Sequence, residues 1–271
     1  MTLKSKIADI ISDIVYKLLL KKSLNYHVSL RNFQRSKPEH IGVFDFGLLS
    51  IYNQKFPEVT IYEKALEATR LHNEDNLSKR LRHYTLFQLL KSTIEKHQDG
   101  HVVECGCFQG QSAYGLASLM KEYNFPNKLM IFDSFEGLSD LSHEDKNELR
   151  ELSEEEIESQ RKCFAATMEL VKKNLSEFNF VEYYKGWIPE RFKEVEKEKF
   201  VFVNIDVDLY HPIKDSLEFF YPRLCKGGII SLDDYGMSQF PGAKTAAEEF
   251  VKKVNPSFFM YLPFGGAFIQ K

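Results

Sequence analysis

Residues 200–208 read Phe200-Val201-Phe202-Val203-Asn204-Ile205-Asp206-Val207-Asp208, and residues 228–234 read Gly228-Ile229-Ile230-Ser231-Leu232-Asp233-Asp234. Each run is typical of a buried strand that ends in acidic residues. Ligands of an open α/β sheet bind beyond the carboxyl ends of its strands. If the two strands are neighbours, four carboxylates converge there, and the nearest bases in the sequence are His211 and Lys214. Such a cluster needs neutralising, so the sequence predicts a divalent cation held by oxygen ligands.

Strands and helices alternate on either side of these runs. The expected strands are residues 101–105, 128–132, 178–184, 200–208 and 228–233, and the expected helices between and after them are 112–123, 154–175, 213–221 and 243–254. Residues 257–262 and 267–270 flank Pro263-Phe264-Gly265-Gly266 and predict a closing hairpin. The spacing indicates an α/β fold with a doubly wound, Rossmann-like sheet. We expect it to be mostly parallel, with one antiparallel strand from the C-terminal hairpin.

The 271-residue chain divides into two parts. Residues 1–75 predict a helical segment that serves as a lid or in oligomerisation, and residues 76–271 predict the main domain. Helices are expected at 61–72 and 78–96. Near the start, apolar residues recur at helical spacing: Ile7, Ile10, Ile11, Ile14, Val15, Leu18 and Leu19.

The N-terminal helix is amphipathic but too short and too charged to span a bilayer. Its basic character leaves peripheral membrane contact open, whereas packing on the main domain or on a second subunit is the simpler interpretation. A homo-oligomer is therefore expected. No small-residue cleavage site follows, so a secretory signal is not expected.

Composition narrows the class of protein. The net charge of −3 gives no reason to expect a nucleic-acid partner. Cys105, Cys107, Cys163 and Cys225 show neither disulfide pairing nor zinc-site spacing. Free thiols in a reducing cytoplasm are the expected state.

A glycine turn follows the first strand, in Glu104-Cys105-Gly106-Cys107-Phe108-Gln109-Gly110-Gln111-Ser112. A strand, a turn with Gly106 and Gly110, and a helix beginning near Ser112 together predict a site for an anionic or nucleoside ligand. A dinucleotide fingerprint needs glycine where Phe108 stands. The spacing therefore favours a smaller adenosyl ligand without phosphates.

The second strand ends at Asp133, followed by Ser134 and Phe135. An acid at this position can accept hydrogen bonds from ribose hydroxyls, and it serves NAD and S-adenosylmethionine equally. The alternative is that Asp133 only caps the turn after it. Asp206 and Asp208 have the same alternative, as caps of the helix near Pro212. Four acids on two neighbouring strands favour a functional site over capping.

Several motifs agree in order and spacing with those of a known family. They are Glu104-Cys105-Gly106, Asp133-Ser134-Phe135-Glu136-Gly137-Leu138, Gly186-Trp187, Asp206-Val207-Asp208-Leu209-Tyr210, Gly227-Gly228-Ile229-Ile230, Asp233-Asp234-Tyr235-Gly236 and Pro241-Gly242-Ala243-Lys244. Over about residues 76–271 the sequence resembles the macrocin O-methyltransferase family. The resemblance implies a class I methyltransferase that uses S-adenosylmethionine and Mg²⁺ to methylate hydroxyls, often on sugars of natural products.

The resemblance also implies roles for individual residues. Asp208 would be a metal ligand and the general base, and Asp233 and Asp234 would complete the protein ligands of Mg²⁺. The expected donor-binding residues, from the resemblance and the two loop motifs, are Glu104, Gly106, Gly110, Ser112, Asp133, Ser134, Phe135, Trp187 and Asp206. The expected acceptor is a small-molecule or glycan hydroxyl, most simply that of a sugar in a glycan or secondary metabolite.

Two other functions fit the same layout. One is an NAD-dependent oxidoreductase, although no His or Lys suited to hydride transfer is evident. The other is a non-catalytic adenosyl-binding scaffold protein, against which the retention of all four acids argues. Whether His211 and Tyr235 contact the acceptor stays open.

Overall fold

The structure, a computed structural model, describes residues 58–146 and 153–271. The expected amphipathic helix, with its membrane or subunit contacts, falls on residues outside this part. Among the helices that the structure does describe, none has both the length and the apolar character needed to cross a bilayer.

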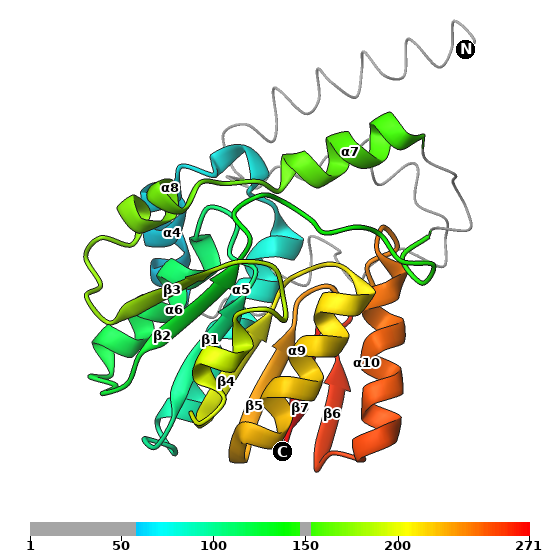
Figure 1. Cartoon of the computed structure of the whole chain (residues 1–271). Coiled ribbons are helices and arrows are strands. Elements are labelled where there is room, and N and C mark those ends of the chain that lie inside the picture. Colours follow the sequence, from blue (N-terminus) through cyan, green and yellow to red (C-terminus); the bar gives the residue numbers. More distant parts are fainter. Residues whose placement is uncertain (1–57, 147–152) are drawn as a thin grey trace, which may run out of the picture.

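A seven-stranded sheet forms the centre of the described chain, in the order β3-β2-β1-β4-β5-β7-β6 (Figure 1). The strands are β1 (His101–Cys105), β2 (Leu129–Asp133), β3 (Val181–Lys185), β4 (Phe200–Ile205), β5 (Leu224–Leu232), β6 (Phe258–Tyr261) and β7 (Ala267–Gln270). Strands β1 to β5 pair in parallel, and β7 pairs antiparallel with both β5 and β6. The predicted fold class is confirmed, including the antiparallel strand from the C-terminal hairpin.

Helices cover both faces of the sheet. The α-helices are α4 (Glu58–Thr69), α5 (Leu77–Ile94), α6 (Gln111–Glu122), α7 (Glu154–Cys163), α8 (Met168–Asn174), α9 (Tyr210–Arg223) and α10 (Pro241–Val254), and the 3₁₀ turns are η3 (His72–Glu74) and η4 (Phe192–Val195). Helices α4, α5 and α6 pack on one face, and α9 and α10 pack on the other (Figure 1). This is the doubly wound arrangement that the alternating pattern predicts.

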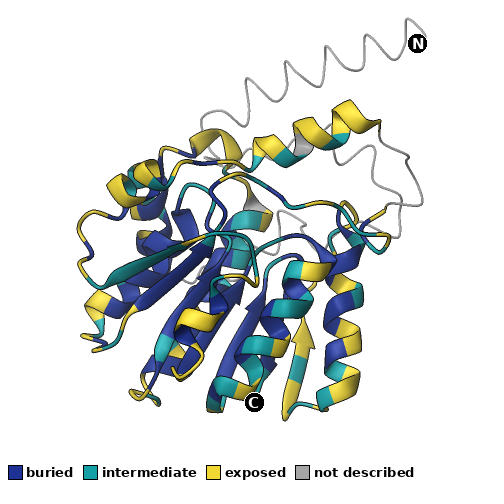
Figure 2. Ribbon diagram, viewed as in Figure 1, coloured by how far each residue is buried: buried dark blue, intermediate teal, exposed yellow. Residues whose placement is uncertain are grey.

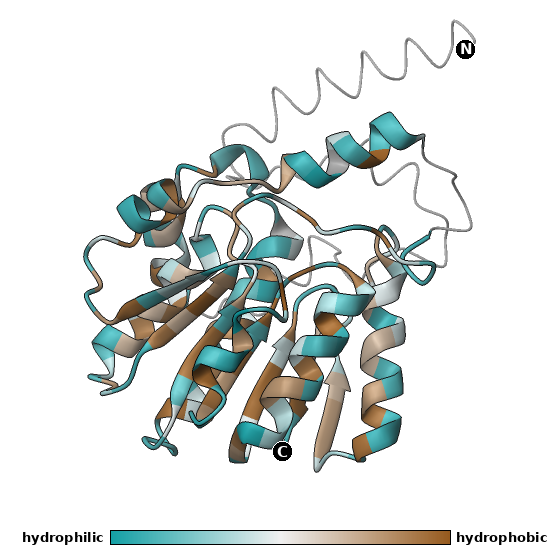
Figure 3. Ribbon diagram, in the orientation of Figure 1, coloured by the Kyte–Doolittle hydropathy of each residue, from teal (hydrophilic) through white to brown (hydrophobic). Residues whose placement is uncertain are grey.

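Each face has its own apolar core. Tyr62 of α4, Phe87 of α5 and Leu116 of α6 belong to one cluster, whereas Phe220 of α9 and Phe250 of α10 belong to the other. The central strands are buried and apolar, whereas the edge strand β6 is largely exposed (Figure 2 and Figure 3). Although α4 lies in the predicted N-terminal segment, it shares a core with α5 and α6 of the main domain.

Several predicted boundaries differ from the structure by a few residues, and two of the differences affect the site. The helix predicted over 154–175 is two helices, because the Thr167 hydroxyl accepts a hydrogen bond from the Leu170 N–H (3.2 Å) and caps a new one, α8. Strand β4 ends at Ile205 instead of 208. The Asp206 N–H still donates to the Cys105 carbonyl (2.8 Å), but the chain then turns into a left-handed conformation at Asp208 (φ 60°). Both aspartates therefore lie in a loop above the sheet.

Candidate active site

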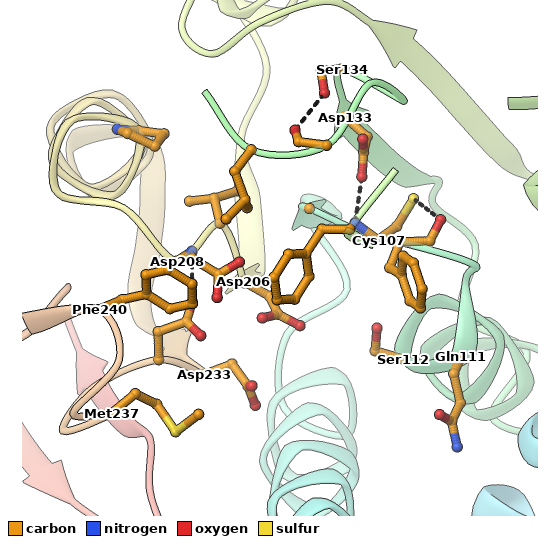
Figure 4. A pocket seen from close by; sticks show the side chains of 18 of the residues that line it. Cys107, Gln111, Ser112, Asp133, Ser134, Asp206, Asp208, Asp233, Met237 and Phe240 are labelled. Carbon is orange, nitrogen blue, oxygen red and sulfur yellow. Dashed lines mark hydrogen bonds between the residues drawn. The ribbon is translucent and has the colours of Figure 1, made fainter. Parts of the chain in front are cut away.

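A cavity of about 460 Å³ opens at the carboxyl ends of the parallel strands. Its walls come from the loops after β1, β2, β3, β4 and β5, from helix α5 and from residues 237–240. Figure 4 shows two groups of side chains pointing into it: Asp206, Asp208 and Asp233 on one side, and Cys107, Ser112 and Asp133 on the other. The cavity therefore has an acidic half and a glycine-turn half.

The acidic half is built by two adjacent strands. Strands β4 and β5 pair with Ile205 opposite Leu232, so the loops that follow them start side by side, and the predicted neighbourhood of the two strands is confirmed. Oxygens of Asp206, Asp233 and Asp234 lie within 4.8 Å of one another, a spacing suited to a shared metal ion. These three residues are called the acidic corner below.

Asp208, the predicted base and metal ligand, lies beside the acidic corner. It lines the same cavity, but the three-carboxylate group includes Asp206 in its stead. The Asp208 backbone N–H donates a hydrogen bond to Asp234 Oδ2 (2.8 Å), so the corner fixes the Asp208 loop through its main chain. Figure 4 shows the Asp208 and Asp206 carboxylates close to each other in the cavity.

Three neighbouring carboxyl groups, those of Asp206, Asp208 and Asp234, hold protons more tightly than free ones do. Burial, and then the charge of Asp206, raises the pKa of Asp208 to about 7. Burial is also the main cause of the raised pKa of Asp206, and burial followed by the charge of Asp208 raises the pKa of Asp234. Packing several acids into a low-dielectric site has this effect when too little positive charge offsets it.

The positive charge beside the corner comes from an unexpected residue. The Arg82 guanidinium of α5 forms an ion pair with Asp233. The sequence predicted Lys214 and His211 as the basic residues nearest to the four carboxylates, and this prediction is wrong. The Lys214 ammonium donates to the Tyr210 hydroxyl (3.0 Å), and His211 is exposed outside the cavity lining.

In the other half of the cavity, Asp133 ties two loops together. Its Oδ2 accepts a hydrogen bond from the Cys107 N–H (2.7 Å), and its Oδ1 accepts one from the Phe135 N–H (2.7 Å). The bond to Phe135 is the local turn that the sequence left open, and the bond to Cys107 joins the β2 loop to the β1 loop. Each oxygen keeps a lone pair that a ribose hydroxyl can use.

Gly106 sets how closely the loops after β1 and β4 approach. It has φ +79°, and a Cβ there would lie 1.8 Å from the Asp206 carbonyl oxygen. A residue with a side chain therefore cannot occupy this position without moving one loop. Gly106, which lines the cavity, therefore packs directly against Asp206 of the acidic corner.

The cavity lining includes six of the nine residues expected around the donor: Gly106, Ser112, Asp133, Ser134, Trp187 and Asp206. Glu104, Gly110 and Phe135 lie behind the lining. Glu104 is fully buried and accepts a hydrogen bond from the Asn204 side chain (3.0 Å), and its Oε2 has no partner. Burial raises the pKa of Glu104 to about 8. Gly110 caps α6, and Phe135 packs in the core.

Sequence reasoning missed part of the lining. Helix α5 contributes Lys79, Arg82 and His83. An aromatic row also lines the cavity, in which Phe108 contacts Phe164 and Phe164 contacts Phe240, with ring centroids 6.5 and 6.2 Å apart. The three rings come from three separate loops or helix ends, and no local pattern links them.

Two residues left open by the sequence lie outside the cavity lining. Tyr235 is buried and its hydroxyl donates to Glu248 of α10 (3.0 Å). His211 packs edge-on against Tyr210 (centroids 5.2 Å apart). Tyr235 therefore contacts α10, and His211 contacts a neighbouring residue of its own helix, α9.

Curated proteins similar to this chain are O-methyltransferases by name. Demethyldecarbamoylnovobiocin O-methyltransferase of Streptomyces niveus is 23% identical over 171 residues, which are 61% of this chain and 63% of that protein. Mycinamicin III 3''-O-methyltransferase of Micromonospora griseorubida is 24% identical over 166 residues, 59% of this chain and 64% of that protein. The match thus spans a little under two thirds of each relative's length.

Solved structures of methyltransferases share the fold. The O-methyltransferase NovP aligns with a TM-score of 0.59 at 21% identity, covering 70% of this chain and 79% of that one. The calicheamicin methyltransferase CalS11 aligns with a TM-score of 0.54 at 23% identity, covering 82% of this chain and 96% of that one. The family model of macrocin O-methyltransferase (TylF) matches residues 63–256, which hold β1 to β5, the acidic corner and the whole cavity lining. This chain belongs to the macrocin O-methyltransferase family.

Proposed function

We propose that this chain transfers a methyl group from S-adenosylmethionine to a hydroxyl of a sugar in a glycan or secondary metabolite, with Mg²⁺ at the acidic corner. The family and the printed activities of the relatives support methyl transfer to oxygen. The observation that carries the proposal is one cavity that joins a Gly106–Asp133 half to a three-carboxylate corner.

The glycine-turn half suits the donor. Gly106 lets the loop after β1 pack closely on the loop after β4 at the cavity wall, and Asp133 offers carboxylate lone pairs to a ribose. Phosphate-free adenosyl ligands fit a turn that has Phe108 where a dinucleotide fingerprint has glycine. When bound, S-adenosylmethionine supplies an already activated methyl group. The relatives give no support to an NAD-dependent oxidoreductase or to a non-catalytic scaffold protein.

The acidic corner suits a hard divalent cation. Mg²⁺ prefers oxygen ligands, and Asp206, Asp233 and Asp234 offer them within 4.8 Å of one another. The raised pKa values of Asp206 and Asp234 indicate that the corner lacks positive charge, as expected of residues that hold a cation. A bound Mg²⁺ would lower the pKa of an acceptor hydroxyl beside it. We therefore propose that Asp206, in place of Asp208, binds Mg²⁺ together with Asp233 and Asp234.

Asp208 is then free to act as the base. It lines the cavity beside the corner, where its carboxyl group interacts with Asp206 and Asp234, and its pKa of about 7 suits proton transfer near neutral pH. A general base contributes ~10²–10⁴-fold in rate, and alignment of donor and acceptor contributes ~7–11 kcal/mol. Asp208 would accept the hydroxyl proton while the acceptor oxygen bonds to the methyl carbon.

The acceptor would lie against the aromatic row. Phe108, Phe164 and Phe240 line the cavity together with the four aspartates, so one ligand can contact rings and carboxylates at once. The apolar face of a sugar packs well on aromatic rings, while its hydroxyls reach polar groups. This combination favours a sugar over a strongly charged acceptor.

The test is a transfer assay with purified protein, S-adenosylmethionine and a panel of rhamnosides and other deoxysugar glycosides, read as release of S-adenosylhomocysteine. We expect transfer with Mg²⁺ and its loss with EDTA, restored by added Mg²⁺. Calorimetry should show binding of S-adenosylhomocysteine and none of NAD. Transfer that is unaffected by EDTA would remove the cation from the proposal, and binding of NAD alone would overturn it.

A further inference from the structure

Arg82 crosses from helix α5 to the acidic corner. Its Nη1 contacts Asp233 Oδ2, although 151 residues separate the two in the chain. Both side chains are largely buried, with 17% of Arg82 and 21% of Asp233 exposed. A buried guanidinium–carboxylate pair loses much of its hydration, so each partner depends on the other for compensation.

The surroundings hold the Arg82 side chain only in part. Its Nε is buried and has no hydrogen-bond partner. Its Cδ lies beneath the β6–β7 turn, 3.6 Å from where a Cβ on Gly265 would stand. The Ser78 hydroxyl of the same helix donates to the Phe264 carbonyl of that turn (3.1 Å). The Ser78 bond holds α5 against the turn, and the ion pair with Asp233 holds the guanidinium end of the Arg82 side chain.

Asp233 is also one of the three carboxylates suited to a metal ion. A dication and a guanidinium on the same carboxylate repel each other, and burial strengthens that repulsion. The Arg82 guanidinium and a bound dication would therefore both need the Asp233 carboxylate as their partner. In the absence of a metal ion, Arg82 is the positive group beside Asp233.

We propose that Arg82 and the divalent cation compete for Asp233, so that cation binding releases the guanidinium from the acidic corner. This inference rests on the proposed function, because it needs a cation at the corner. Arg82 is then a counter-charge for the empty corner and sets the cation concentration at which the site fills. Once released, the guanidinium stays in the cavity wall beside Lys79 and His83.

A second arrangement predicts the opposite result. If Arg82 instead stayed on Asp233 and oriented it for the metal, its removal would weaken cation binding. Competition predicts tighter binding when Arg82 is removed. The sign of the change therefore separates the two.

The experiment measures binding of Mg²⁺ alone by calorimetry and of Mn²⁺ alone by electron paramagnetic resonance, on the full chain at pH 8. We expect Arg82→Met to bind either ion about 10-fold more tightly, equal to about 1.4 kcal/mol. Arg82→Lys keeps a charge but loses the planar fork, and should lie between Arg82→Met and the unsubstituted chain. It also provides the measurement if Arg82→Met does not fold.

Arg223→Met is the matched control. Arg223 is the last residue of α9, and its Cζ lies 4.0 Å from the centroid of the Phe219 ring. It does not line the cavity. Its loss removes the same charge and should leave cation affinity unchanged. Equal or weaker binding in Arg82→Met would overturn the competition alone. If neither Arg82→Met nor the unsubstituted chain binds either ion, the cation of the proposed function fails as well.

Discussion

The Asp208 backbone N–H donates a 2.8 Å hydrogen bond to the carboxylate of Asp234, which joins the loop after β4 to the loop after β5. One carboxylate of the acidic corner thus holds the main chain of the residue that we assign as the base. The side chain of Asp208 lines the cavity and interacts with the Asp234 carboxyl group as well.

Asp208→Asn should lower turnover by ~10²–10⁴-fold, because an amide of the same shape cannot accept the hydroxyl proton. The affinity for S-adenosylhomocysteine, measured by calorimetry, should not change. Asp215→Asn is the control, since Asp215 lies on α9 outside the cavity lining. Full turnover in Asp208→Asn would show that another group takes the proton.

Two substitutions of Asp234 should separate its charge from its hydrogen bond. Asp234→Asn keeps an oxygen that can accept from the Asp208 N–H, but loses the negative charge, so Mg²⁺ affinity should fall while folding is retained. Asp234→Ala loses both and should also lower the melting temperature, because the buried N–H is left unpaired at a cost of about 1–3 kcal/mol. Calorimetry and thermal unfolding measure the two effects. Equal Mg²⁺ affinity in Asp234→Asn and the unsubstituted chain would remove Asp234 from the ligand set.

Glu104 should make stability depend on pH. Its pKa is about 8 in the folded protein, against an ordinary value of 4.5. Between these values the folded protein keeps a proton that the unfolded chain has lost. The contribution of Glu104 to the free energy of unfolding is therefore highest below about pH 4.5, falls as the pH rises towards 8 and then levels off, with a span on the order of a few kcal/mol.

Glu104→Gln should remove this dependence, because the amide stays neutral and its oxygen can still accept from Asn204. Urea unfolding at several pH values should show the variant gaining stability relative to the unsubstituted chain between about pH 5 and pH 8. Parallel curves for the two proteins would mean that Glu104 is ionised in the fold.

Gly106→Ala should prevent the loops after β1 and β4 from approaching, since a Cβ would lie 1.8 Å from the Asp206 carbonyl oxygen. We expect loss of donor binding and a large fall in melting temperature. Gly236→Ala isolates the contact from backbone strain. Gly236 also has a positive φ (+86°), but no atom lies within 4 Å of its Cβ position. It should cost only the ~1–2 kcal/mol of a left-handed residue with a side chain, so comparable effects in both would contradict the steric argument.

Phe164→Ala should raise the KM for a glycoside acceptor about 3- to 10-fold, which corresponds to ~0.5–1.5 kcal/mol of ring contact. The dissociation constant of S-adenosylhomocysteine should not change. Phe180→Ala, the same substitution at a half-buried ring outside the cavity lining, is the control. An unchanged acceptor KM in Phe164→Ala would place the acceptor elsewhere in the cavity.

Sequence reasoning succeeded where the chemistry is local. An apolar run that ends in aspartates is visible along a few residues, and the parallel order of the strands then brings Asp206 and Asp233 to one edge of the sheet. The exchange of Asp208 for Asp206 in the carboxylate cluster depends on one left-handed turn, which residue type alone does not predict. Periodicity predicts a strand well but sets its last residue poorly.

Arg82 and the aromatic row could not have been found in this way. The contact of Arg82 with Asp233 requires α5 to pack beside the β6–β7 turn. These two elements lie far apart in the sequence. Phe164 reaches the cavity because Thr167 starts a new helix and leaves residues 164–167 as a bend. Such contacts follow from tertiary packing, for which the sequence offers no short-range pattern.

The aromatic row joins three segments that are independent in the chain, and none of its rings belongs to the carboxylate cluster. Under the proposed function, acceptor recognition and proton transfer therefore depend on different side chains. Because Phe164 lies in a segment that holds neither the glycine turn nor an aspartate of the cavity, an engineer could exchange that segment to change acceptor preference and leave the proposed donor and proton-transfer residues in place.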